Sequence, residues 1–67
     1  MTTNKIELII PCHNELDTID ELIRRIDNVK TNNDLNLYLT FVDDSDDGTH
    51  LLIEERIEKH KYIKLIR

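Results

Sequence analysis

The sequence predicts an α/β domain built on a parallel β-sheet. Three runs typical of strands alternate with two runs typical of helices, in the order β-α-β-α-β. The first strand-like run, Lys5–Pro11, is nearly continuous in apolar residues, which is typical of a strand covered on both faces. Alternation of strands and helices favours a parallel sheet joined by right-handed crossovers. The expected fold is therefore half of a doubly wound α/β domain.

The first helix is predicted from a change of period. Pro11 cannot donate a hydrogen bond to a strand ladder, so we expect the first strand to end there. From Glu15 onward, apolar residues recur at spacings of three and four and form one face of an amphipathic helix. These residues are Leu16, Ile19, Leu22, Ile23, Ile26 and Val29. Acidic residues crowd the start of this run and basic residues lie toward its end, an order that suits the helix dipole.

The second half of the chain repeats this alternation. A polar loop over Thr31–Asn36 precedes a strand-like run, Leu37–Val42. An acidic loop containing Gly48 follows, and a second helix is predicted from about Thr49 to Lys59. Its inner face is predicted to consist of Leu52, Ile53 and Ile57. A third strand is predicted over Tyr62–Ile66.

Length and composition limit the classes of protein. A chain of 67 residues is one small domain at most. The formal net charge of −5 argues against a nucleic-acid surface, which would need a clustered basic face. Cys12 is the only cysteine, and a lone thiol fits a reducing, cytoplasmic compartment. We expect neither a signal peptide nor a membrane-spanning segment, because no apolar run is long enough.

The chain stops directly after the third predicted strand. Sheets of this class usually have about five or more strands, so we expect residues 1–67 to be a single partial domain of a longer protein. An apolar strand left at the edge of a sheet tends to pair with another chain. We therefore expect self-association through an exposed sheet edge.

Chemistry-bearing residues gather after the first and second predicted strands. The first stretch is IIPCHNE, over residues 9–15, and the second is FVDDSDDGT, over residues 41–49. In open parallel sheets, ligands bind just outside the carboxyl ends of the strands. Consecutive strands joined by one helix are neighbours, so we expect the two loops to lie side by side. This convergence is the strongest functional signal in the sequence.

The acidic loop admits two simple roles. Asp43 and Asp44 leave the end of a strand, where a carboxylate can accept charge-assisted hydrogen bonds from a base or from ribose hydroxyls. Gly48 permits a backbone with positive φ or the close approach of a ligand. Asp47 or Thr49 can instead cap the following helix. Capping is a common role for such residues, but two adjacent acids followed by two more exceed what one helix cap requires.

Together, IELIIPCHNE and FVDDSDDGT resemble the N-terminal signature of family 2 glycosyltransferases. The resemblance is greatest to the dolichol-phosphate mannosyltransferase-like and polyisoprenyl-phosphate sugar transferases. In that family a strand ends in Pro-Cys-Tyr-Asn-Glu or a similar motif, and Val-Asp-Asp-Gly-Ser-x-Asp-Gly-Thr follows the next strand. The resemblance covers essentially the whole chain, with both motifs in the expected order. It implies the Rossmann-like N-terminal half of a GT-A domain and transfer of a sugar from a nucleotide-diphosphate sugar.

Carried over by position, the resemblance assigns residues to a nucleotide pocket. Pro11, His13 and Glu15 would line the pocket, and Asp44 would contact the base, with Asp43 beside it. The sequence departs from the family pattern in three ways. His13 stands where tyrosine or phenylalanine is commoner, the acidic loop is one residue shorter than the commonest form, and Ser45 stands where glycine is frequent.

The resemblance also implies features that lie outside this chain. In the family, the metal-binding Asp-x-Asp and the catalytic base lie further along the sequence. No catalytic or metal-binding residue is therefore expected in residues 1–67, and this fragment is expected to be inactive alone. The intact enzyme is expected to use Mg²⁺ or Mn²⁺, a UDP- or GDP-linked donor, and a hydroxyl or lipid-phosphate acceptor. Its expected location is the cytoplasm, including the cytoplasmic face of a membrane.

A calcium-binding loop is an alternative function for the acidic segment. The residues from Asp43 to Glu54 match the EF-hand pattern, with Gly48 at the sixth place and Glu54 at the twelfth. An EF-hand needs a helix before the loop, whereas residues 37–42 are typical of a strand. A receiver-like phosphoacceptor domain is a third alternative, but its acid pair would follow the first strand.

Overall fold

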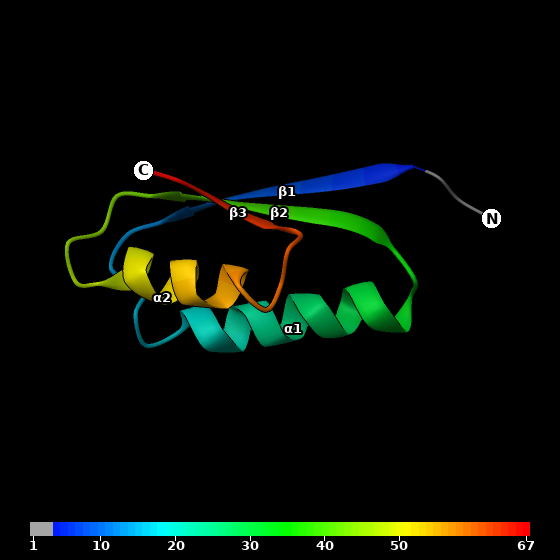
Figure 1. Ribbon diagram of the computed structural model, residues 1–67, viewed down its shortest axis with the longest axis horizontal. Helices are drawn as coiled ribbons and strands as arrows, with labels where there is room; N and C mark the ends of the chain where they lie inside the picture. The colour runs from blue at the N-terminus through cyan, green and yellow to red at the C-terminus, as the bar shows by residue number, and fades with distance from the viewer. Residues whose placement is uncertain (1–3) are drawn as a thin grey trace.

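The predicted order of strands and helices is confirmed by the computed structural model, which describes residues 4–67 (Figure 1). Its elements are β1 (Lys5–Cys12), α1 (Ile19–Asn32), β2 (Asn36–Asp43), α2 (Thr49–Ile57) and β3 (Ile63–Ile66). The strands form one parallel sheet in the order β1-β2-β3. The fold is therefore α/β, with the arrangement expected of the first half of a Rossmann-like domain.

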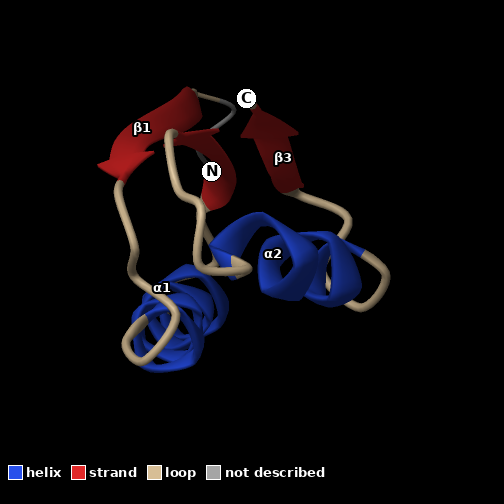
Figure 2. Ribbon diagram, turned by 90° about the vertical axis from the view of Figure 1, so that its left-hand side faces the viewer, coloured by secondary structure: helices blue, strands red, loops and turns tan. Residues whose placement is uncertain are grey.

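The molecule has two layers, a sheet and a pair of helices on one of its faces (Figure 2). Each crossover leads from one strand to its next neighbour, in the same direction along the sheet. Crossovers that share one hand and one direction place their helices on the same face. For this reason α1 and α2 lie side by side beneath the sheet. Neither helix of the described chain is long and apolar enough to span a membrane.

The hydrophobic core lies between the sheet and the two helices. Side chains alternate between the faces of a strand, so every second residue of β2 points into this layer. Leu39 and Phe41 of β2 have no exposed surface, and they belong to one buried cluster with Ile19 of α1 and Ile53 of α2. Complete burial of a side chain of this size contributes about 1.5–3 kcal/mol. The central strand and the two helices therefore hold each other in place.

One face of the sheet is bare in the described residues, whereas the apolar run of β1 predicted a strand covered on both faces. Ile9 of β1 is 69% exposed and Ile66 of β3 is 54% exposed. Their side chains alternate with the buried positions and point away from the helices, as do those of Tyr38 and Val42 in β2. The helices cover a single face because both crossovers have the same sense.

The prediction that β1 ends at Pro11 is wrong by one residue. Pro11 pairs with Val42, and Cys12 pairs with Asp43. The carbonyl of Cys12 accepts a hydrogen bond from the backbone of Asp44, so Cys12 directs its backbone groups toward β2. Adjacent residues of a strand direct theirs to opposite sides. The nitrogen of Pro11 therefore faces the open edge of the sheet, where no hydrogen-bond donor is required.

The first helix begins later than the apolar period predicts. The carbonyl of Glu15 accepts hydrogen bonds from the backbone of Thr18 and of Ile19, which makes a turn before α1. Leu16 lies in this turn and is exposed, so it does not belong to the inner face of the helix. Val29 is also exposed, beside a shallow groove between α1 and the sheet. The rest of the predicted face is buried or half-buried.

Candidate functional site

The two loops predicted to meet do lie together, at the carboxyl ends of β1 and β2. The last residues of these strands, Cys12 and Asp43, are paired in the ladder. Pairing continues one step into the loop, because the backbone of Asp44 donates a hydrogen bond to the carbonyl of Cys12 at 2.9 Å. Parallel pairing makes this meeting unavoidable, since both strands point the same way.

Asn14 joins the loop after β1 to the loop after β2. Its backbone N–H donates to the Ser45 hydroxyl at 2.7 Å, and its side-chain oxygen accepts a hydrogen bond from the backbone of Asp46 at 3.1 Å. Asn14 has a φ of 53°, a left-handed conformation that asparagine tolerates better than most residues. The sequence interpretation missed this residue. The available signal was an asparagine two residues after the end of a strand, since asparagine is a frequent turn residue.

A second connection runs through the buried Thr49 at the start of α2. The Thr49 hydroxyl accepts a hydrogen bond from the backbone of Glu15 at 3.1 Å and donates one to the carboxylate of Asp47. The same carboxylate accepts from the backbone N–H of Thr49 at 3.0 Å. These bonds, with the Thr49 hydroxyl first, lower the pKa of Asp47. Gly48, between Asp47 and Thr49, has a φ of 93°, and no atom of the described residues lies near the place of a Cβ. Glycine is therefore needed there for its backbone conformation alone.

His13 is attached to the acidic loop by its ring. Its Nδ1 lies 2.8 Å from the backbone oxygen of Asp44. A carbonyl oxygen only accepts hydrogen bonds, so Nδ1 carries a hydrogen, and in the neutral ring Nε2 remains an acceptor. The residue is exposed, and its ring lies at the surface of the edge where the two loops meet.

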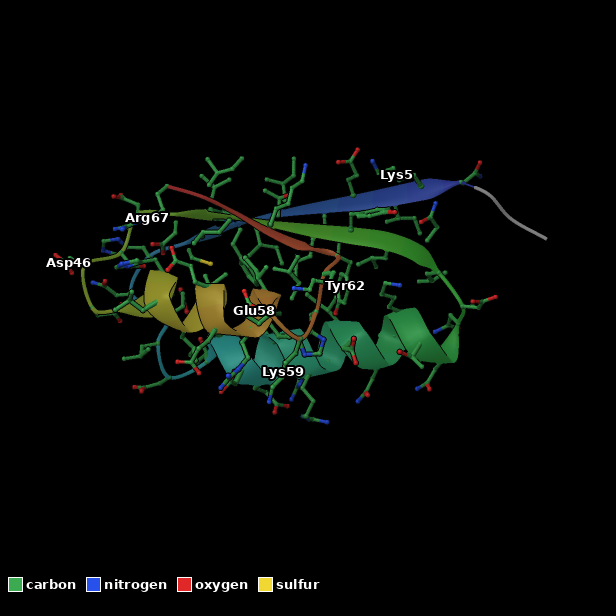
Figure 3. All side chains as sticks on the ribbon, viewed as in Figure 1. Lys5, Asp46, Glu58, Lys59, Tyr62 and Arg67 are labelled. Carbon is green, nitrogen blue, oxygen red and sulfur yellow. The ribbon has the colours of Figure 1, made fainter. Side chains whose placement is uncertain are left out.

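The two adjacent acids have opposite surroundings. Alternation along β2 turns the Asp43 side chain toward the helix layer, where it has no exposed area, and leaves Asp44 exposed. Within the described residues, neither carboxylate oxygen of Asp43 has a hydrogen-bond partner. Arg67, which follows β3, places its Nε 3.7 Å from Oδ2 of Asp43. Figure 3 shows Arg67 and Asp46 at the same end of the molecule, far from Lys5.

The structure thus brings the predicted site residues to one edge. Four of them, Pro11, His13, Glu15 and Asp44, are exposed there, and Asp43 lies buried beneath the loop. The carboxylate of Glu15 accepts a hydrogen bond from the hydroxyl of Thr18 at 3.0 Å, which turns it toward the start of α1.

The calcium-loop alternative finds no support in this geometry. A strand, β2, precedes the acidic loop, and an EF-hand would need a helix there. Asp43 faces the interior, while Glu54 is exposed on α2. Within residues 4–67, no three histidine, cysteine or carboxylate side chains are grouped closely enough to hold a metal ion. The acids of this loop therefore do not form a cation cage.

The parallel sheet, with two loops joined at its carboxyl edge, is typical of open α/β proteins. Proteins of this class bind their ligands at that edge. The chain belongs to glycosyl transferase family 2, whose sequence model matches residues 7–67. The fold is accordingly the Rossmann-like N-terminal half of a GT-A domain. Membership of the family supports glycosyltransferase activity in the intact protein, with a nucleotide-sugar donor and an acceptor. Comparisons with curated proteins and with solved structures gave no match.

Replacing Thr49 by valine tests the connection between the loops. We expect the free energy of unfolding to fall by about 0.5–1.5 kcal/mol, because the buried hydroxyl of Thr49 no longer accepts the hydrogen bond from the backbone of Glu15. Urea unfolding followed by circular dichroism measures the change. Thr40→Val makes the same substitution on the bare face of β2 and should have little effect. Equal losses in the two variants would show that the Thr49 hydroxyl has no special role.

The thiol of Cys12 provides a pH-dependent prediction. Burial, and then the negative charges of Asp43 and Glu15, raise the pKa of Cys12 from 9.0 to about 11. The folded protein therefore favours the protonated thiol, and this contribution to stability is complete below pH 9 and lost as the pH rises to about 11. Ultraviolet thiolate absorbance, taken as the difference from a Cys12→Ala variant, measures the midpoint. A midpoint that is the same in the folded protein and in urea would contradict this prediction.

Proposed function

We propose that this chain is the nucleotide-sugar-binding part of a glycosyltransferase that transfers a sugar from a nucleotide-diphosphate sugar to an acceptor hydroxyl or lipid phosphate. The observation that carries the proposal is the joining of two loops at the carboxyl edge of the sheet. Asn14 bonds to Ser45 at 2.7 Å, and Glu15 bonds to Thr49 at 3.1 Å. Open α/β sheets bind ligands at this edge, and membership of glycosyl transferase family 2 supports a nucleotide sugar as that ligand.

The proposed contacts divide between the two loops. Asp44 accepts hydrogen bonds from the base, because its side chain is exposed while its backbone oxygen is held by His13. Asp43 lies beside it on the buried side of the loop. Pro11, next to the last residue of β1, lines the pocket together with His13 and Glu15 of the following loop. The pocket so formed would fix the nucleotide and leave the sugar to residues that follow in the intact protein.

The donor, the metal and the catalytic residues belong to the intact enzyme. We propose a UDP- or GDP-linked donor and a relation to dolichol-phosphate mannosyltransferase-like and polyisoprenyl-phosphate sugar transferases, which would place the reaction at the cytoplasmic face of a membrane. Mg²⁺ or Mn²⁺ belongs to the proposal for the intact enzyme, but the described residues do not form a set of ligands for it. The metal ligands and the catalytic base are proposed to lie outside residues 1–67, so this segment alone would not turn over substrate.

Self-association of the isolated chain is part of the same proposal. β1 occupies the edge of the sheet, and Ile9 in that strand is 69% exposed. Unpaired backbone groups beside apolar surface favour pairing with a second chain. We expect the sedimentation coefficient of the isolated chain to rise with protein concentration. A coefficient that stays monomeric at all concentrations, or that rises equally in an Ile9→Lys variant, would contradict pairing through this edge.

Asp44→Asn tests the nucleotide proposal. We expect it to weaken binding of UDP or GDP roughly ten- to a hundredfold, because a hydrogen bond to a charged group is worth about 1.5–3 kcal/mol. The measurement is an amide NMR titration of the labelled chain, with UDP and GDP added separately in the presence of EDTA. Asp34→Asn is the matched control. Asp34 is exposed in the loop before β2, and its φ of 51° suits asparagine equally well.

The outcomes of this titration are distinct. Shifts at His13, Glu15 and Asp44 that saturate with one nucleotide, and an unchanged affinity in the Asp34→Asn variant, would support the proposal and identify the base. Equal weakening in both variants would remove Asp44 from the contact. Saturable shifts from Asp43 to Glu54 with Ca²⁺, and none with nucleotides, would favour the calcium loop instead. The absence of chemical-shift changes with every ligand would overturn nucleotide binding by this segment.

A further inference from the structure

Asp43 presents an electrostatic problem that the proposed nucleotide contacts do not solve. Its side chain has no exposed area, and neither carboxylate oxygen accepts a hydrogen bond within residues 4–67. A buried carboxylate without a partner is strongly unfavourable, because it has lost its hydration and gained nothing in return. A compensating positive charge is therefore expected close to Asp43.

Arg67 supplies that charge, and the sheet register explains why it is there. Val42 of β2 pairs with Ile66 of β3, so the next residue of each chain segment, Asp43 and Arg67, emerge beside each other. The guanidinium Nε lies 3.7 Å from Oδ2 of Asp43. This distance is too long for a hydrogen bond, so the contact is chiefly a charge–charge interaction. The position of Arg67 follows directly from parallel pairing of β2 with β3.

The Arg67 side chain also contacts Ser45, the residue that follows Asp44. Nη2 of Arg67 lies 3.5 Å from the backbone oxygen of Ser45. One guanidinium therefore contacts the residue before Asp44 and the residue after it. Ser45 in turn accepts the hydrogen bond from Asn14 that ties the two loops together. Arg67 thus acts on the segment that presents the exposed carboxylate of Asp44.

We propose that Arg67 is a positioning residue for the acidic loop: it balances the buried charge of Asp43 and holds the carbonyl of Ser45, and so fixes Asp44 between them. Exposed ion pairs are usually worth little, and the Arg67 side chain is 50% exposed. Its partner, however, is removed from water, so their attraction is less screened than that of a surface pair. The effect on nucleotide binding rests on the function proposed above, whereas the effect on the loop does not.

Amide hydrogen exchange measures the effect of Arg67 on the loop directly. The backbone amides of Asn14 and Asp46 are the donors of two bonds that join the loops. We expect Arg67→Ala to speed exchange at both amides roughly tenfold, because the loop opens more often when Asp43 is left unpaired. Arg67→Lys keeps the charge and should restore most of the protection. Lys64→Ala is the control for net charge, since Lys64 is exposed on β3, the strand that precedes Arg67, and points to the bare face.

An Asp43→Asn variant shows whether Arg67 acts by balancing the charge of Asp43 or only by packing against the loop. Asparagine at position 43 has no charge to balance, so Arg67→Ala should have little further effect on exchange in an Asp43→Asn chain. If Arg67→Ala instead speeds exchange equally with Asp43 and with Asn at that position, Arg67 does not act through Asp43 and the inference is overturned. An Arg67→Ala effect no larger than that of Lys64→Ala would overturn it as well. Should Arg67→Ala fail to fold, the same comparison is made with Arg67→Gln.

Nucleotide affinity tests the second half of the inference. With UDP or GDP as the probe, Arg67→Ala should weaken binding roughly three- to tenfold, with partial recovery in Arg67→Lys. Weakened binding together with faster exchange at Asn14 and Asp46 supports the whole inference. Faster exchange with no nucleotide binding in any variant supports the positioning of the loop and rejects the proposed function. Unchanged exchange and unchanged affinity reject the inference and leave the proposed function intact.

Discussion

Parallel pairing of β1 with β2 is the constraint on which the rest of the structure depends. It brings Cys12 and Asp43 opposite each other and sends both following loops out of the same edge of the sheet. Every connection between the loops, from Asn14 to Thr49, is possible only because the strands end level with each other. The register of β2 with β3 extends the same constraint to Arg67. A slip of one residue in either pair would reverse which side chains face the helices.

The alternation of side chains along β2 gives two adjacent acids different tasks. Asp43 is buried, and its charge adds to the effect of burial in raising the pKa of the neighbouring Cys12 thiol. Asp44 is exposed at the start of the loop after β2. Ligand-binding residues work best when neighbouring contacts hold them rigidly in place. Here rigidity comes from hydrogen bonds between loop backbones and the short side chains of Asn14, Ser45 and Thr49. Short side chains lose little rotamer entropy when they are held in this way.

The bare face of the sheet, like the site, follows from the parallel order of the strands. Two crossovers of one sense carry the chain from β1 to β3 and leave both helices on a single side. The apolar residues of the opposite face, including Ile9 and Ile66, then lack a covering layer in the described residues. The strong apolar character of β1 is consistent with a strand that has a second layer to meet. That layer is not needed to build the edge where the loops join, because the edge is formed by β1, β2 and the start of α2.

Much of the fold could be read from the sequence, because strand and helix periods differ and the chain alternates between them cleanly. The same reasoning found the edge of the site, since ligands of parallel sheets bind where strands end. Other features depend on contacts between residues far apart in the chain. Sequence spacing could not show that Asn14 reaches Asp46, that Arg67 lies beside Asp43, or that Pro11 tolerates a place within the strand. Strand register and the order of strands decide these, and both arise only when the whole sheet has assembled.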